Sequence, residues 1–201
     1  MCDTTKPSIS FKIDYDTLCN NGYGSEVELC VMVNNRCVTK NKDHTNDKIY
    51  DTITVYVEEF VDWLQWLLDD YGYKDMYPLS EEEAKHMLGK NSTTDYSDFD
   101  PEWYSDGNGW TKAWEFEHSM DIMGHGIIWP NVQIYKSSIP DNVCIKVSPR
   151  KYSGKTNPYM TYLETGFTAH ILEQDFVTAV QKVIDEYNTH MSLKGIENEV
   201  K

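Results

Sequence analysis

The sequence has no long apolar run and little positive charge. No stretch approaches the roughly 20 apolar residues that a membrane helix requires, and the first residues, MCDTTKPSIS, have no apolar segment typical of a signal peptide. Lysine and arginine number 18 against 33 acidic residues, which gives a formal net charge of -15. Such a surface repels phosphate groups. We therefore expect a cytoplasmic protein that binds neither a membrane nor nucleic acid directly.

Paired cysteine motifs are also missing. The five cysteines form an odd set without a Cys-x-x-Cys pair, and free thiols are the default for such a set in a reducing cytoplasm. A hairpin turning at Asn34-Asn35 would set Met32 opposite Cys37, with Cys30 on the same face but diagonal to Cys37. That diagonal is a poor position for a disulfide. It predicts that the two thiols belong to the core.

No standard motif for binding a metal or a cofactor is present, and we expect the protein to bind neither. His118 and His125 are separated by Gly124, so they do not share one rigid helix face, and no His-Glu-x-x-His accompanies them. A calcium loop needs glycine at its sixth position and glutamate at its twelfth. A loop starting at Asp98 has Gly109 at the twelfth position, and one starting at Asp106 has Thr111 at the sixth.

Apolar periodicity predicts one α+β domain over residues 1–201, with a mainly antiparallel sheet of about six to seven strands and three to four helices packed on it. Alternating patterns predict strands over Ser8–Tyr15, Glu26–Val33, Arg36–Lys40, Thr52–Val57, Ile127–Tyr135, Asn142–Val147 and Leu163–Ile171. Helical spacing predicts helices over Glu58–Tyr71, Ser80–Leu88, Trp110–Met123 and Glu173 to about His190.

Polar composition predicts three stretches without regular structure. Residues Lys40 to Asp47 read as a polar loop, and the tail at about 192–201 is expected to be frayed. The longest such stretch is an acidic loop at about 90–109, rich in Asn, Ser, Asp and Gly. Loops of that length are either functional or loosely ordered.

His118 and Ser119 are the candidate catalytic pair, with His125 and Asp121 nearby. Adjacent positions on a helix point about 100° apart, so the two side chains do not face each other. No Gly-x-Ser-x-Gly turn surrounds Ser119. A structural role, in which the pair closes the helix against a sheet by hydrogen bonds, is the favoured interpretation.

The acidic loop carries the candidate partner-binding residues. Carboxylates and aromatic rings alternate there, and Trp and Tyr dominate interface energetics. The set comprises Asp95, Asp98, Asp100, Glu102, Trp103, Tyr104 and Asp106. A solvated loop and a contact surface for a basic partner are both compatible with this composition.

The stretch EFEHSMDIMGHGIIWPNVQIY resembles a bacterial domain that is often fused ahead of ImmA/IrrE-type metallopeptidase domains in phage- and stress-related proteins. Members have a strand, a Trp-rich helix, a helix ending in His-Ser, a Gly-rich turn, Trp-Pro-Asn and a strand. Here these blocks correspond to Trp63–Leu68, His118-Ser119, Gly124, Gly126 and Trp129-Pro130-Asn131. The terminal helix after Phe176 is also similar in kind.

The resemblance implies a setting in bacteria–phage conflict or stress sensing and brings no catalytic residue with it. The metallopeptidase half with His-Glu-x-x-His is missing here, and the acidic loop has no counterpart. We therefore expect a non-enzymatic inhibitor, immunity-like protein or sensor that binds the basic surface of a partner protein such as a nuclease or toxin. A surface that mimics nucleic acid is a special case. The alternative is a small hydrolase or nucleotide-processing enzyme centred on His118.

Overall fold

The computed structural model describes residues 6–20, 24–69, 72–74, 120, 130–149 and 159–199. For residues 194–199 it describes the main chain only. Within these residues the protein is α+β, and every strand pairing is antiparallel, which confirms the predicted class. The prediction of one sheet with six to seven strands is wrong, because the described strands form three smaller sheets. Apolar alternation shows which face of a strand is buried, but it does not show which strand lies beside it.

The first sheet is built around β2. Its strands are β1 (Ile9–Asn20), β2 (Ser25–Val33), β3 (Arg36–Cys37) and β6 (Ile53–Tyr56). β2 pairs with the other three. Buried and half-exposed residues alternate along its whole length, so one face packs against the core while the other is turned outward. Asn34 and Asn35 adopt φ values of 50° and 61°, which confirms the predicted turn between β2 and β3.

β1 is the edge strand of this sheet among the described residues, and its pairing with β2 is interrupted. The register runs regularly from Ile9 opposite Val33 to Asp14 opposite Glu28, then shifts before it resumes at Cys19 opposite Glu26. Thr17 stabilises this β-bulge, because its hydroxyl donates to the carbonyl of Asp14 at 2.6 Å and accepts the N–H of Glu28 at 3.0 Å.

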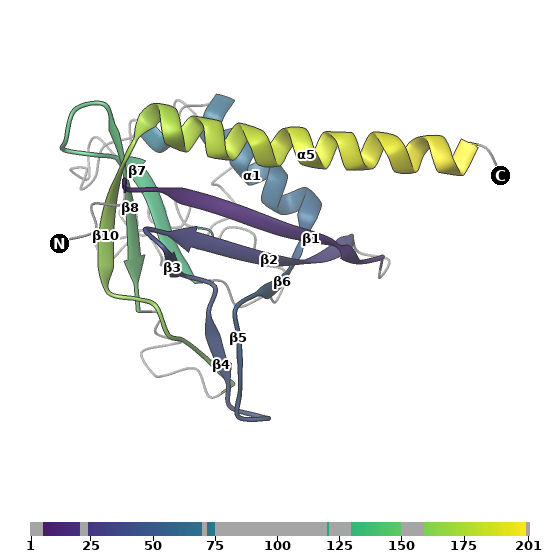
Figure 1. The fold of residues 1–201 in the computed structure, drawn as a ribbon, viewed down its shortest axis with the longest axis horizontal. Coiled ribbons are helices and arrows are strands. Elements are labelled where there is room, and N and C mark those ends of the chain that lie inside the picture. The colour runs from purple at the N-terminus through teal and green to yellow at the C-terminus, as the bar shows by residue number, and fades with distance from the viewer. Residues whose placement is uncertain are drawn as a thin grey trace, which may run out of the picture.

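The second sheet has the order β10-β8-β7. Its strands are β7 (Asn131–Lys136), β8 (Asn142–Ser148) and β10 (Phe167–Leu172). The antiparallel β7–β8 pair confirms the prediction for this part of the chain. Consecutive residues of β7 and β8 are buried, so both faces of this sheet are covered. In Figure 1 these strands run steeply across the direction of β1 and β2.

The third sheet is small and polar, and it corrects the prediction of a loop from Lys40 to Asp47. Its strands are β4 (Asn41–Asp43), β5 (Lys48–Tyr50) and β9 (Met160–Tyr162), with β4 in the middle. The hairpin between β4 and β5 is held by polar groups, since Asp43 accepts the N–H of Thr45 at 2.7 Å and Asp47 adopts a φ of 59°. Such a strand pair has no apolar alternation to reveal it.

Two α-helices lie in the described part of the chain, α1 (Val57–Asp69) and α5 (Glu173–Glu199), together with a short 3-10 helix, η1 (Gly72–Lys74). α1 buries Phe60, Leu64 and Leu67 on one face, as its spacing predicts. α5 begins directly after β10 and continues beyond its predicted end near His190 (Figure 1). The predicted helices Ser80–Leu88 and Trp110–Met123 and the acidic loop at 90–109 lie outside the described residues.

α1 and α5 pack on the same face of the first sheet. The ring of Phe11 on β1 lies 5.7 Å from that of Phe60 on α1, and the ring of Tyr73 on η1 lies 5.5 Å from that of Phe176 on α5. Tyr73 also donates a hydrogen bond to Glu173 at 3.0 Å, and Lys74 pairs with the same carboxylate at 2.9 Å. The first residue of α5 is thereby tied to the segment that follows α1.

This contact predicts a pH dependence of stability. The Lys74 ammonium, helped by the Tyr73 hydroxyl, holds the pKa of Glu173 below its ordinary value. A carboxyl with a lowered folded-state pKa stabilises the protein above its unfolded pKa of about 4.3, and this contribution disappears as the pH falls further. Glu173→Gln should therefore lower the free energy of unfolding at neutral pH, and the difference from the wild type should shrink between about pH 5 and pH 3.

Urea unfolding at a series of pH values measures this difference. Glu186→Gln is the matched control, because Glu186 pairs with Lys182 at 3.6 Å and its side chain is 51% exposed. Exposed pairs at this spacing contribute only about 0.3–0.5 kcal/mol. If Glu173→Gln lowers the free energy of unfolding at neutral pH by no more than the control does, the contact of Glu173 with Tyr73 and Lys74 does not have the stabilising role assigned to it.

Candidate functional site

None of the site residues predicted from the sequence lies in the described part of the chain. The candidate catalytic residues outside it are His118, Ser119 and His125. The candidate partner-binding residues outside it are Asp95, Asp98, Asp100, Glu102, Trp103, Tyr104 and Asp106. Both hypotheses therefore stay predictions. Three other clusters of side chains stand out among the described residues.

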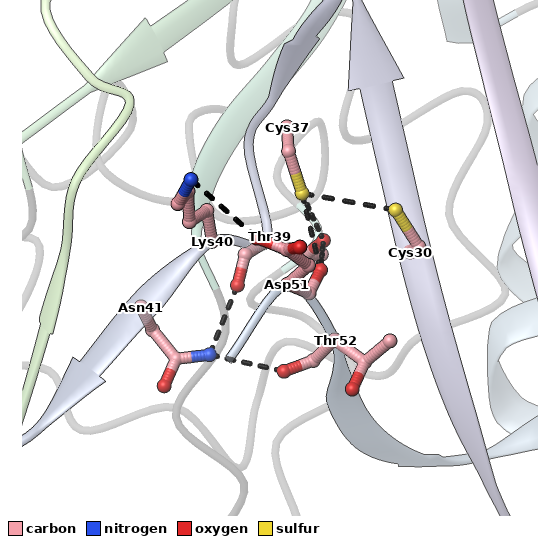
Figure 2. Close-up of polar contacts among 7 residues, drawn as sticks. All are labelled: Cys30, Cys37, Thr39, Lys40, Asn41, Asp51 and Thr52. Atoms are coloured by element: carbon pink, nitrogen blue, oxygen red, sulfur yellow. Dashed lines mark hydrogen bonds and ion pairs between the residues drawn. The ribbon is translucent and has the colours of Figure 1, made fainter. Parts of the chain in front are cut away.

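The first cluster is a pair of thiols on the outer face of the first sheet. Met32 pairs with Cys37, as the sequence predicts. Cys30 and Cys37 are half-exposed rather than part of the core, which corrects the prediction for them. Their sulfur atoms lie 3.7 Å apart (Figure 2). Cys30 points outward because it alternates with the buried residues Leu29 and Val31 of β2, and Cys37 lies beside it on β3.

A buried polar network supports this pair from below. The Thr39 hydroxyl accepts the N–H of Val31 at 3.1 Å and donates to the carbonyl of Asp51 at 2.7 Å. The side-chain amide of Asn41 donates to the carbonyls of Thr39 and Thr52, each at 3.0 Å (Figure 2). Thr39 is fully buried. These bonds join β2, β4 and the segment before β6 where no regular ladder connects them.

A cavity of about 310 Å³ opens beside the thiols. Four charged side chains line it and pair with each other, Arg36 with Glu164 at 2.8 Å and Lys40 with Asp51 at 3.7 Å. The Cys37 thiol donates to the carbonyl of Asp51 at 3.1 Å. Burial, followed by the neighbouring Cys37, raises the pKa of the Cys30 thiol to about 11. Among the described residues, no group of three or more His, Cys, Asp or Glu side chains gathers as metal ligands.

The second cluster is a groove between β1 and α5 on the opposite face of the sheet. It has a volume of about 880 Å³. Half-buried Ile13 and Tyr15 of β1 form one wall, and Val177 and Leu193 of α5 contribute apolar surface to the other. α5 extends past the ends of β1 and β2, so its last turns have no described strand beneath them (Figure 1). Leu193, which lines the groove, is 59% exposed.

Two carboxylates line this groove. Glu186 pairs with Lys182 at 3.6 Å, whereas Asp185 accepts a hydrogen bond from the neutral amide of Gln181 at 3.0 Å. No cation of the described residues pairs with Asp185. The groove therefore combines apolar walls with an acidic edge, a combination that suits an amphipathic basic ligand.

Two polar atoms of the groove wall have no hydrogen-bond partner among the described residues. The rings of Tyr15 and His190 stack with centroids 4.3 Å apart and planes inclined by 18°. The Tyr15 hydroxyl and His190 Nε2 are both buried and unpaired. Burial raises the pKa of Tyr15 to about 12, with a further contribution from Glu186. Unpaired buried polar groups cost free energy, so the stack is a place where a bound partner can supply missing hydrogen bonds.

The third cluster is a Ser-His pair that sequence reasoning missed. Ser137 follows β7, and its Oγ lies 2.7 Å from Nδ1 of His170 on β10. The same Oγ accepts the N–H of Ile139 at 2.9 Å. The hydroxyl thus closes the turn between β7 and β8 and fastens it to β10, which is a structural role. No local signal could find this pair, because the two residues meet only through the strand order of the sheet.

The Thr39 network leads to a prediction about stability. Thr39→Val keeps the shape of the side chain but leaves the buried N–H of Val31 without an acceptor, which costs about 1–3 kcal/mol. Thr39→Ser keeps the hydroxyl and removes one methyl group, worth about 0.8 kcal/mol. Urea unfolding should therefore rank the valine variant below the serine variant. Equal losses would show that the hydroxyl contributes little.

None of the helices in the described residues combines the length and the apolar character needed to span a bilayer.

Comparisons with known proteins give no family for this chain. No family model matches the sequence, and no curated protein or solved structure matches it either.

Proposed function

We propose that the protein is a non-enzymatic interaction module that binds a basic, amphipathic segment of a partner protein in the groove between β1 and α5. The observation that carries this proposal is the groove itself, with its apolar walls and the carboxylate of Asp185, which pairs with no cation of the described residues. The net charge of -15 adds a long-range attraction for basic partners.

The groove offers the contacts that such a segment needs. Ile13, Val177 and Leu193 can receive apolar side chains, and each square ångström of apolar surface removed from water contributes about 25 cal/mol. A lysine or arginine on the partner can pair with Asp185. Main-chain groups of the bound segment can reach Tyr15 and His190 once the ring stack shifts. A helix with apolar residues on one face and basic residues beside them satisfies all three requirements.

The acidic loop at about 90–109 supplies a second contact region in this proposal. Its support is the composition of the loop alone, in which carboxylates alternate with Trp103 and Tyr104. A partner with a basic surface, such as a nuclease or toxin, fits both regions. The setting in bacteria–phage conflict or stress response rests on the resemblance carried by His118-Ser119 and Trp129-Pro130-Asn131.

A peptide-binding experiment tests the groove. The probe is a fluorescent synthetic helix with leucines on one face and lysines on the flanks, and its anisotropy is measured with the full-length protein. Binding should weaken by at least about tenfold between about 20 mM and 500 mM salt, because exposed charges are screened. Leu193→Ser should weaken binding at low salt by about tenfold, the effect expected when an apolar anchor worth about 1.4 kcal/mol is lost.

Leu172→Ser is the matched control. Leu172 is also an exposed leucine, at 44%, but it precedes α5 and does not line the groove. A further variant changes Asp95, Asp98, Asp100, Glu102 and Asp106 to amides. If only this variant loses affinity for the peptide, the contact lies on the acidic loop. If Leu193→Ser and Leu172→Ser bind the peptide equally well, the groove is not the binding site.

A further inference from the structure

We propose that Cys30 and Cys37 form a reversible dithiol–disulfide site on the outer face of the first sheet, which is oxidised by low-molecular-weight disulfides. This inference is independent of the groove, because the thiols lie on the other face of β2. It rests on the contact between the two sulfur atoms and on the cavity beside them.

The two thiols are already close enough to react with little movement. Their sulfur atoms lie 3.7 Å apart, whereas a disulfide requires about 2.05 Å. Cys37 is the last residue of β3, and the N–H of Val38 still donates to the carbonyl of Val31 on β2 at 2.9 Å. Because Val38 and Thr39 are buried and bonded to Val31, the two sulfur atoms approach each other by rotation of the cysteine side chains. The core face of β2 remains in place.

The surroundings allow a small molecule to reach the pair. Both thiols line the cavity of about 310 Å³, and both are half-exposed. The other described thiols lack this combination, since Cys19 is exposed on β1 and Cys144 is buried in β8. Ion pairs of Arg36 with Glu164 and of Lys40 with Asp51 line the entrance, so neither sign of charge is in excess there.

The reaction is a thiol–disulfide exchange in two steps. The Cys37 thiolate attacks one sulfur of the small disulfide, forms a mixed disulfide and releases the first small thiolate. Cys30 then loses its proton to solvent and attacks Sγ of Cys37, which forms the internal disulfide and releases the second small thiolate. The protein loses two electrons and two protons, and the small disulfide is reduced to two thiols.

The order of attack follows from the environment of the two thiols. The pKa of Cys30 is raised to about 11, so Cys30 is almost fully protonated at neutral pH and is the weaker first nucleophile. Oxidation removes the hydrogen bond from Cys37 to the carbonyl of Asp51, but the Thr39 hydroxyl still donates to that carbonyl at 2.7 Å. No buried acceptor is therefore left unpaired by the disulfide.

Peptide mapping tests the proposal on the full-length chain. The reduced protein is incubated with oxidised glutathione at mildly alkaline pH, alkylated and digested with trypsin without reductant. Cleavage after Lys12, Arg36 and Lys40 separates the two cysteines. The expected product is the peptide Ile13–Arg36 joined to Cys37–Lys40 through one disulfide, which a reductant separates again. Cys19 lies in the first peptide, so the Cys19→Ser variant must give the same linked product.

Two controls make the result decisive. Cys30→Ser should lose the linked product and carry a glutathione adduct on Cys37. The folded protein should also reach half-oxidation at a ratio of oxidised to reduced glutathione at least about threefold lower than in concentrated urea, because folding holds the thiols together. Separate adducts or unmodified thiols in Cys19→Ser would overturn the proposal. So would easier oxidation of the unfolded chain.

Discussion

The alternation of buried and outward residues along β2 is the constraint on which most of the described structure depends. β2 is the only described strand that pairs with three others, and its buried face carries Val27, Leu29, Val31 and Val33. α1 packs on that face, and α5 packs beside it against β1. Because a slip of one residue would exchange the two faces, the burial of these four side chains also fixes what the other face displays. This alternation turns Cys30 to the outer face of the sheet.

Sequence reasoning succeeded for contacts between near neighbours in the chain. The Asn34-Asn35 turn, the buried face of α1 and the β7–β8 pair are each encoded within a short window. It failed where residues distant in the chain decide the outcome. The division into three sheets depends on which strands meet, and β4 pairs with β9 from far along the chain although β4 has no apolar residue and β9 spans only three residues.

The candidate sites likewise combine features that the local sequence predicts with features that depend on distant parts of the chain. Most residues of the groove lie on elements that the sequence predicts, but Leu193 lies beyond the predicted end of the last helix near His190. The polar segment after His190, with Gly195, gives no periodicity that would indicate a longer helix. The sequence correctly predicts that Met32 pairs with Cys37, which puts Cys30 and Cys37 on one face. It does not predict the partial exposure of the two thiols, because their exposure depends on what covers that face of the sheet.

The β-bulge in β1 has a consequence for association between copies of the protein. An edge strand presents main-chain N–H and C=O groups that can pair with an edge of another molecule. Between Asp14 and Cys19 the register of β1 shifts, and Thr17 turns its hydroxyl back onto the main chain of Asp14 and Glu28. The longest described strand thus offers a visiting strand only a short regular template, which disfavours open-ended stacking of copies into fibres.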